Sequence, residues 1–266
     1  MIQRVRNAFG IERAARPSKL TPDGPRLFVN LQDYVIGVQT VLGIYEQEEI
    51  ALVQRLVQPG HHVIDIGANI GVFTVTLAQS VGATGRVYAF EPIPHLAALL
   101  FRSIAENHFD WVTLEQAALS AERGSVELLQ ILGGPNQGGS YIVPEKSAPP
   151  EGHQIVNAPT YRLDDYPCER PIHFIKMDVE GAEPLAMRGA TTLLQHDHPL
   201  ILSEICPPQL DRVSHTNATA FIGEMATLGY VCYLCGGESK GAQITEYTSD
   251  EIINVLFVPR NRSSPL

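Results

Sequence analysis

The strongest constraint on the fold is a series of short apolar runs separated by segments of helix length. Each run has the length of a buried strand, and most of the intervening segments carry one apolar face. Strands that alternate with helices in this way form βαβ crossovers and a mainly parallel sheet. The apolar runs are VIDIG, VYAFEP, VTLEQAAL, HFIKMDVEG, PLILSEI and VCYLC, and the helices are predicted at 71–81, 94–107, 182–195 and 217–228.

The segments at either end of this pattern define the expected domain limits. With 266 residues and 44% apolar composition, the chain can bury the core of one α/β domain. IINVLFVP follows VCYLC without room for a long helix, so we expect an antiparallel return at or near a sheet edge. RLFVNLQDYVIGV alternates like a hairpin, and EQEEIALVQRLV has the spacing of a helix. The predicted divisions are a basic arm at 1–25, a single domain at 26–260 with a Gly/Pro-rich loop at 133–159, and a tail at 261–266.

Charge and cysteine content restrict the class of partner. The 19 Lys and Arg residues against 29 Asp and Glu give a net charge of -10, which argues against general affinity for nucleic acid and favours a neutral or cationic small acceptor. No apolar run is long enough to span a membrane or to form a secretory signal, so we expect a cytoplasmic protein. Cys232 and Cys235 form a lone CxxC within an apolar run, which indicates strand packing more than zinc. The sequence leaves the oligomeric state open.

The first predicted strand ends in a glycine-containing loop, where ligands bind in open α/β sheets. Gly67, Asn69 and Gly71 follow VIDI, but neither the three-glycine dinucleotide fingerprint nor a GK[ST] motif is present. This pattern favours a cofactor that lacks a pyrophosphate. Asp65 at the end of the strand suits a cationic amino group, such as that of S-adenosylmethionine.

The second predicted strand delivers a carboxylate at the spacing expected for a ribose contact. Glu91 follows VYAF, 20 residues after Gly71. A carboxylate at this place accepts hydrogen bonds from both ribose hydroxyls. We therefore predict that Glu91 binds the ribose of the cofactor.

Taken together, these motifs resemble the FkbM-type methyltransferases from about residue 45 to residue 259. The matching segments, in order, are YE, PGHHVIDIGANIGVFTVTLA, VYAFEPIP, EN, AALS, IHFIKMDVEGAEPLAMRGA and PLILSEI. The resemblance implies a Rossmann-like class I methyltransferase fold, S-adenosylmethionine as methyl donor, and most often a hydroxyl oxygen as acceptor, on sugars or other natural products.

The resemblance also implies roles for individual residues. By position, the contacts to the methionine part of the donor and to the loop are Asp65, Gly67, Asn69 and Gly71, the ribose contact is Glu91, the adenine wall is Ala117 and Ala118, and the residue facing the sulfonium end is Asp178.

Carboxylates predicted at the same edge of the sheet are the catalytic candidates. Asp178 and Glu180 follow one buried strand, and Glu204 ends the next one. Methyl transfer from a sulfonium requires alignment and a proton acceptor, so Glu204 or Asp178 is the candidate base, with His215 as a further candidate. These carboxylates are also compatible with a divalent cation, an alternative that we do not favour. Glu183 is interpreted as a first-turn acid that binds free helix amides.

Other functions remain open at this stage. The same donor is compatible with a carboxylate acceptor on a peptide or small acid, although the acidic composition counts against it. A cofactor-binding scaffold without chemistry is a second alternative. A dehydrogenase is a third, against which the missing dinucleotide fingerprint argues.

Overall fold

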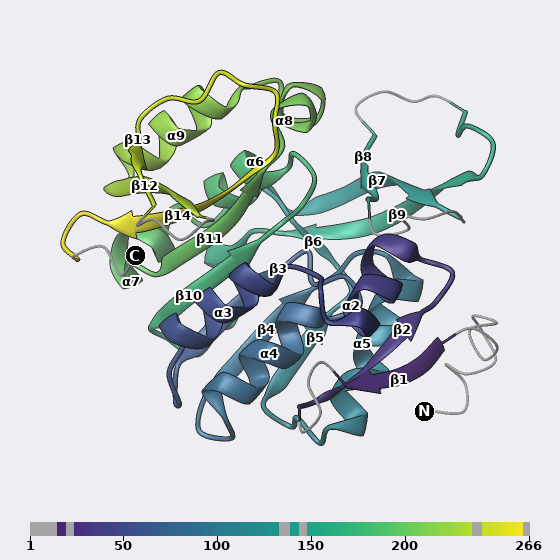
Figure 1. Cartoon of the computed structure of the whole chain (residues 1–266). Coiled ribbons are helices and arrows are strands. Elements are labelled where there is room, and N and C mark those ends of the chain that lie inside the picture. Colours follow the sequence, from purple (N-terminus) through teal and green to yellow (C-terminus); the bar gives the residue numbers. More distant parts are fainter. Residues whose placement is uncertain (1–14, 20–23, 133–138, 144–147, 236–240, 263–266) are drawn as a thin grey trace.

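The core of the protein is one large twisted sheet (Figure 1). The computed structural model describes residues 15–19, 24–132, 139–143, 148–235 and 241–262. The strand order is β13-β12-β14-β11-β10-β3-β4-β5. The strands are β3 (His62–Ile66), β4 (Arg86–Phe90), β5 (Val112–Glu115), β10 (Ile172–Met177), β11 (Leu200–Ile205), β12 (Tyr230–Cys235), β13 (Gln243–Ile244) and β14 (Ile253–Pro259).

Strand directions agree with the sequence prediction. β5, β4, β3, β10 and β11 are mutually parallel, and their carboxyl ends therefore lie at one edge. β14 is antiparallel to both of its neighbours, β11 and β12. The antiparallel return is thus confirmed, and β14 lies near the end of the described sheet, with only β12 and β13 beyond it.

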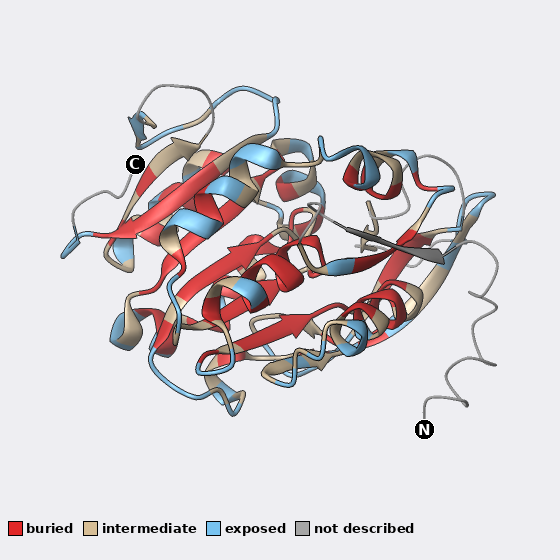
Figure 2. Ribbon diagram, turned by 60° about the horizontal axis from the view of Figure 1, so that its bottom comes forward, coloured by how far each residue is buried: buried red, intermediate tan, exposed pale blue. Residues whose placement is uncertain are grey.

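Helices cover both faces of this sheet, and its strands are buried (Figure 2). Alternate residues of one strand serve the two faces: Val63 packs in one apolar cluster and Ile64 in the other. The helices that contribute to the Val63 side are α3 (Gln47–Leu56) and α4 (Val72–Val81), with α5 (Pro94–Glu106) packed next to β5. The helices that contribute to the Ile64 side are α6 (Glu183–Arg188), α7 (Thr191–Asp197), α8 (Pro207–Ser214) and α9 (Ala218–Thr227).

A second, four-stranded sheet includes part of the region predicted as a long loop. Its order is β6-β9-β7-β8, with β6 (Ala118–Leu119), β7 (Gly124–Ile131), β8 (Tyr141–Ile142) and β9 (His153–Tyr161). The loop prediction at 133–159 was wrong for residues 141–142, which form β8, and for residues 153–159, which pair with residues 125–131 of β7. Residues 133–138 and 144–147 lie outside the described residues. The run VTLEQAAL also divides, because β5 belongs to the large sheet and β6 to the small one.

The amino-terminal segment differs from the predicted hairpin. β1 (Ala15–Lys19), which falls in the predicted basic arm, pairs antiparallel with β2 (Arg26–Asn30). The residues after β2 form η2 (Tyr34–Val38), a π-helix, and α2 (Gln39–Leu42). The side chain of Asp33 accepts a hydrogen bond of 2.9 Å from the amide of Ile36, which starts this helical turn in place of a returning strand.

The helix predicted at 182–195 is two helices. Gly189 ends α6, and a Cβ at this position would lie 2.1 Å from the carbonyl oxygen of Ser120. The short helix η3 (Leu163–Asp165) lies next to the break between the two helices. Its Asp164 carboxylate accepts hydrogen bonds from the amides of Thr192 (3.0 Å) and Leu193 (2.8 Å), and so caps α7.

The cysteines and other potential metal ligands show the following arrangement in the structure. All four cysteines are free, and Cys232 is buried in β12. Within the described ranges, no group of three or more His, Cys, Asp or Glu side chains is arranged to hold a metal ion. In the same part of the chain, no helix combines the length and the apolar character needed to cross a bilayer.

The cap on α7 gives a prediction about stability. We expect Asp164→Ala to lower the free energy of unfolding by about 1 kcal/mol or somewhat more, because two helix amides lose their acceptor. Asp165→Ala is the matched control, since the Asp165 side chain is 61% exposed and pairs only with Arg162 at 3.5 Å. Urea unfolding followed by circular dichroism measures both; equal midpoints for the two variants would contradict the assignment.

Candidate functional site

A cavity of about 420 Å³ lies at the carboxyl edge of the parallel strands. Its walls come from the ends of β3, β4, β10 and β11, from the small sheet, and from the segment between η2 and α3. The sequence predicted the residues from the four strand ends. Eight of the predicted site residues line this cavity: Gly67, Asn69, Glu91, Ala117, Ala118, Asp178, Glu180 and Glu204.

The loop after β3 approaches β10 closely because it has no side chain at Gly67. Gly67 has φ +78°, and a Cβ there would lie 1.9 Å from the carbonyl oxygen of Asp178. Asn69 also has a positive φ, 54°, a conformation that Asn tolerates better than most residues. The loop therefore packs against the end of β10 and brings both strand ends to the same cavity.

Glu91 closes this loop by accepting two backbone hydrogen bonds. Its Oε2 accepts from the amide of Asn69 at 2.7 Å, and its Oε1 accepts from the amide of Ile93 at 2.8 Å. Burial raises the pKa of Glu91 to about 7, although both amides act in the opposite direction. Each carboxylate oxygen keeps a second lone pair that can accept a ligand hydroxyl.

Three carboxylates meet at the other end of the cavity. Asp178 follows β10, Glu204 lies in β11, and Glu180 is held with φ 51° in the turn before α6. Burial, followed by the charge of Asp178, raises the pKa of Glu180 to about 8. Burial and the charges of Asp178 and Glu180 raise the pKa of Glu204 to about 9. Such groups can exchange protons near neutral pH.

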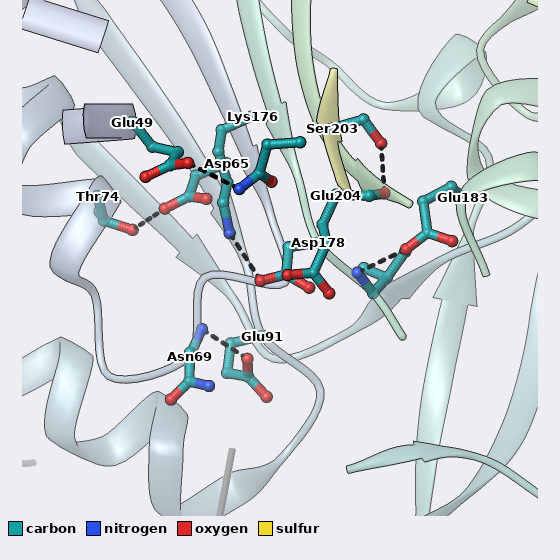
Figure 3. A network of polar contacts seen from close by, with 12 residues as sticks. Glu49, Asp65, Asn69, Thr74, Glu91, Lys176, Asp178, Glu183, Ser203 and Glu204 are labelled. Atoms are coloured by element: carbon teal, nitrogen blue, oxygen red, sulfur yellow. Dashed lines mark hydrogen bonds and ion pairs between the residues drawn. The ribbon is translucent and has the colours of Figure 1, made fainter. Parts of the chain in front are cut away.

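A buried lysine next to these carboxylates was not predicted from the sequence. Lys176 is in β10, is only 7% exposed, and lies 3.4 Å from an oxygen of Asp178 (Figure 3). Burial alone would lower the pKa of this lysine, but the surrounding carboxylates, Asp178 first, raise it. A signal was present in the sequence: a charged residue inside the apolar run HFIKM needs a buried partner.

Three predicted site residues do not line the cavity. Asp65 is fully buried behind it and accepts a hydrogen bond of 2.6 Å from the hydroxyl of Thr74, so it faces α4 instead of a ligand (Figure 3). Gly71 is the amino-terminal cap of α4 and packs against Leu100. His215 is exposed at the carboxyl end of α8.

Glu183 has the structural role that its position indicated. It is 1% exposed, and its Oε1 accepts hydrogen bonds from the amides of Val179 (3.1 Å) and Gly181 (3.3 Å). It therefore fixes the turn that carries Asp178 and Glu180. Its own place is behind the cavity wall, because it is not among the lining residues.

Another part of the cavity wall combines apolar side chains with a Tyr-Glu pair. Tyr45 and Glu46 lie between α2 and α3, and their side chains share a hydrogen bond. Burial raises the pKa of both groups. Apolar lining residues come from distant parts of the chain: Val35 and Ile36 from η2, Ile142 from β8, and Ile252 before β14.

Comparison with known proteins places this site in a family. Residues 65–232, more than half of the chain, match the methyltransferase FkbM domain. No curated protein matches the sequence.

Several solved structures are similar. One is a SAM-dependent O-methyltransferase from Thermotoga maritima (11% identity, TM-score 0.48, covering 94% of this chain and 80% of that one). Another is methyltransferase FkbM from Methylobacillus flagellatus (15%, TM-score 0.46, 84% and 52%). A third is a putative rRNA methylase from Clostridium thermocellum (13%, TM-score 0.47, 80% and 93%).

The matched segment begins at Asp65, on the strand that leads into the cavity, and ends in β12. It thus contains Glu91, Asp178, Glu180 and Glu204 together with the parallel strands that position them. The chain belongs to the FkbM methyltransferase family and is an S-adenosylmethionine-dependent methyltransferase with a Rossmann-like class I fold.

Proposed function

We propose that this enzyme transfers a methyl group from S-adenosylmethionine to a hydroxyl oxygen of a small molecule. The observation that carries the proposal is the pair Glu180 and Glu204, two cavity carboxylates whose pKa values are raised to about 8 and about 9. A carboxylate with such a pKa is a suitable acceptor for the proton that a hydroxyl loses during methylation.

The residues at the β3 and β4 end of the cavity fit the donor. Glu91 offers two carboxylate oxygens for the ribose hydroxyls, and among the described lining residues no basic side chain stands beside it to favour a phosphate. Ala117 and Ala118 give a flat wall for an adenine ring, next to Ile93. Asp178 at the other end attracts the positive charges of the methionine part. We do not assign Asp65 a direct contact with the donor.

The residues at the β10 and β11 end would align the acceptor and remove its proton. When bound, the donor supplies a methyl group on a sulfonium, which is a good leaving group. Glu204 is assigned as the base, because its pKa is raised the most among the cavity carboxylates and it lies beside Asp178 (Figure 3). Glu180 lines the same cavity, and its charge helps to raise the pKa of Glu204.

The charge of the cavity favours an uncharged or cationic acceptor. Among the described residues that line it, five are acidic and none is Arg, Lys or His. A carboxylate acceptor, the alternative that would give a methyl ester, or a nucleic acid phosphate would be repelled here. The apolar lining residues Val35, Ile36 and Ile252 suit an acceptor with a hydrocarbon part.

The donor assignment predicts a specific pattern of binding. In isothermal titration, S-adenosylmethionine and S-adenosylhomocysteine should bind saturably and NAD should not. Glu91→Ala should weaken both by about tenfold or more, the usual effect of losing hydrogen bonds to a charged acceptor. Circular dichroism checks that the variant folds. Glu151→Ala, at an exposed position, is the control; unchanged affinity in Glu91→Ala would remove Glu91 from the donor site.

The acceptor assignment is tested with matched compounds. Release of S-adenosylhomocysteine should be stimulated by hydroxylated sugars or other natural products and not by the same compounds with the hydroxyl already blocked as a methyl ether. Mass spectrometry then locates the new methyl group. Formation of methyl esters from carboxylic acids would replace the proposed function with the alternative one.

The base assignment predicts a pH dependence. A raised pKa leaves Glu204 protonated at neutral pH, so the turnover of the wild-type enzyme should rise with pH until this group is deprotonated near pH 9. Glu204→Gln should lower turnover by about a hundredfold, flatten the pH profile and leave donor affinity within about twofold. Activity that is lost on adding a chelator would instead favour the metal alternative.

A further inference from the structure

Lys176 lies next to the cavity as the partner of Asp178, and the proposed function gives it no role. It lies in the middle of the sheet, in β10 between β3 and β11, where both neighbouring strands are buried. Placing an ammonium group there is costly unless anions compensate for the lost water. Apolar packing alone therefore does not explain a lysine at this position.

Acidic residues from four parts of the chain act on the charge of Lys176. Asp178, which follows β10, forms an ion pair with Lys176 at 3.4 Å, and the Lys176 ammonium lies 4.7 Å from the centre of the Phe73 ring in α4. Asp65, its register partner in β3, lies on one side, and Glu204 of β11 and Glu46 before α3 also act on its charge.

Lys176 supplies a positive charge next to an acidic cavity. Within the described residues, no Arg, Lys or His side chain lines the cavity, whereas five acidic side chains do. Lys176 itself is not part of the lining, but it forms an ion pair with the lining residue Asp178. The position of the Asp178 carboxylate therefore depends on a residue behind the cavity wall.

We propose that Lys176 is a positioning residue of the donor site: through their ion pair it holds the Asp178 carboxylate where it faces the donor. This inference rests on the proposed assignment of Asp178 to the donor. Without Lys176, the Asp178 carboxylate loses its ion-pair partner at 3.4 Å, so its oxygens are no longer held at the place from which they attract the positive charge of the donor.

The test is the affinity for S-adenosylhomocysteine, measured by isothermal titration at one neutral pH. Lys176→Met should bind about tenfold or more weakly than the wild-type protein, because Asp178 loses the charged partner that orients it. Lys176→Arg keeps the charge and should stay within about threefold of wild type.

A double-mutant cycle separates positioning from general destabilisation. If Lys176 acts through Asp178, then Lys176→Met should have little further effect on affinity in an Asp178→Asn background. Arg86→Met is the control, since it removes a cation at the opposite, amino-terminal end of β4. If Lys176→Met does not fold, Lys176→Gln against Lys176→Arg makes the same comparison.

The outcomes are distinct. Weak binding by Lys176→Met, with rescue by Lys176→Arg and little further effect in the Asp178→Asn background, would support the inference. Affinity of Lys176→Met equal to wild type, or additive effects with Asp178→Asn, would overturn it while leaving the donor assignment intact. Failure of the wild-type protein to bind S-adenosylhomocysteine would overturn both.

Discussion

The parallel pairing of β3 with β10 is the constraint on which the rest of the site depends. It places Lys176 beside Asp65 and lets the loop at Gly67 pack against the carbonyl of Asp178. Because the neighbouring strands β4 and β11 run in the same direction, Glu91 and Glu204 reach the same edge. One register therefore determines both the shape of the cavity and the distribution of charge within it.

The small sheet forms a part of the cavity wall that the large sheet does not provide. The chain leaves β5 through Ala117 and enters β6, so that the turn between the two sheets becomes a cavity wall. Leu128 of β7 and Ile142 of β8 extend this wall with apolar surface. The cavity is thus acidic at the strand ends and apolar where the small sheet and η2 surround it, which is the expected character of a site for an amphipathic small molecule.

Most of the large sheet could be predicted from the sequence, because its strands and helices have distinct periods and because parallel strands share a functional edge. The errors have physical reasons. β9 was missed because its nine residues, HQIVNAPTY, are half-buried and carry polar side chains and a proline. The break at Gly189 depends on Ser120, which is distant in sequence. Asp65 was assigned to the ligand because the sequence does not show toward which face of the sheet a side chain at the end of a strand points. In the structure the Asp65 side chain points toward Thr74 and accepts a hydrogen bond from its hydroxyl.

Stability and pH are coupled through the buried acids. The pKa values of Glu91, Glu180 and Glu204 are raised in the folded protein, so the folded state binds protons more tightly than the unfolded one. Their contribution to stability is present below the unfolded pKa and is lost as pH rises through about 7 to 9. The cluster of acids that gives the cavity its charge therefore destabilises the empty fold at alkaline pH, where these carboxylates ionise close to one another.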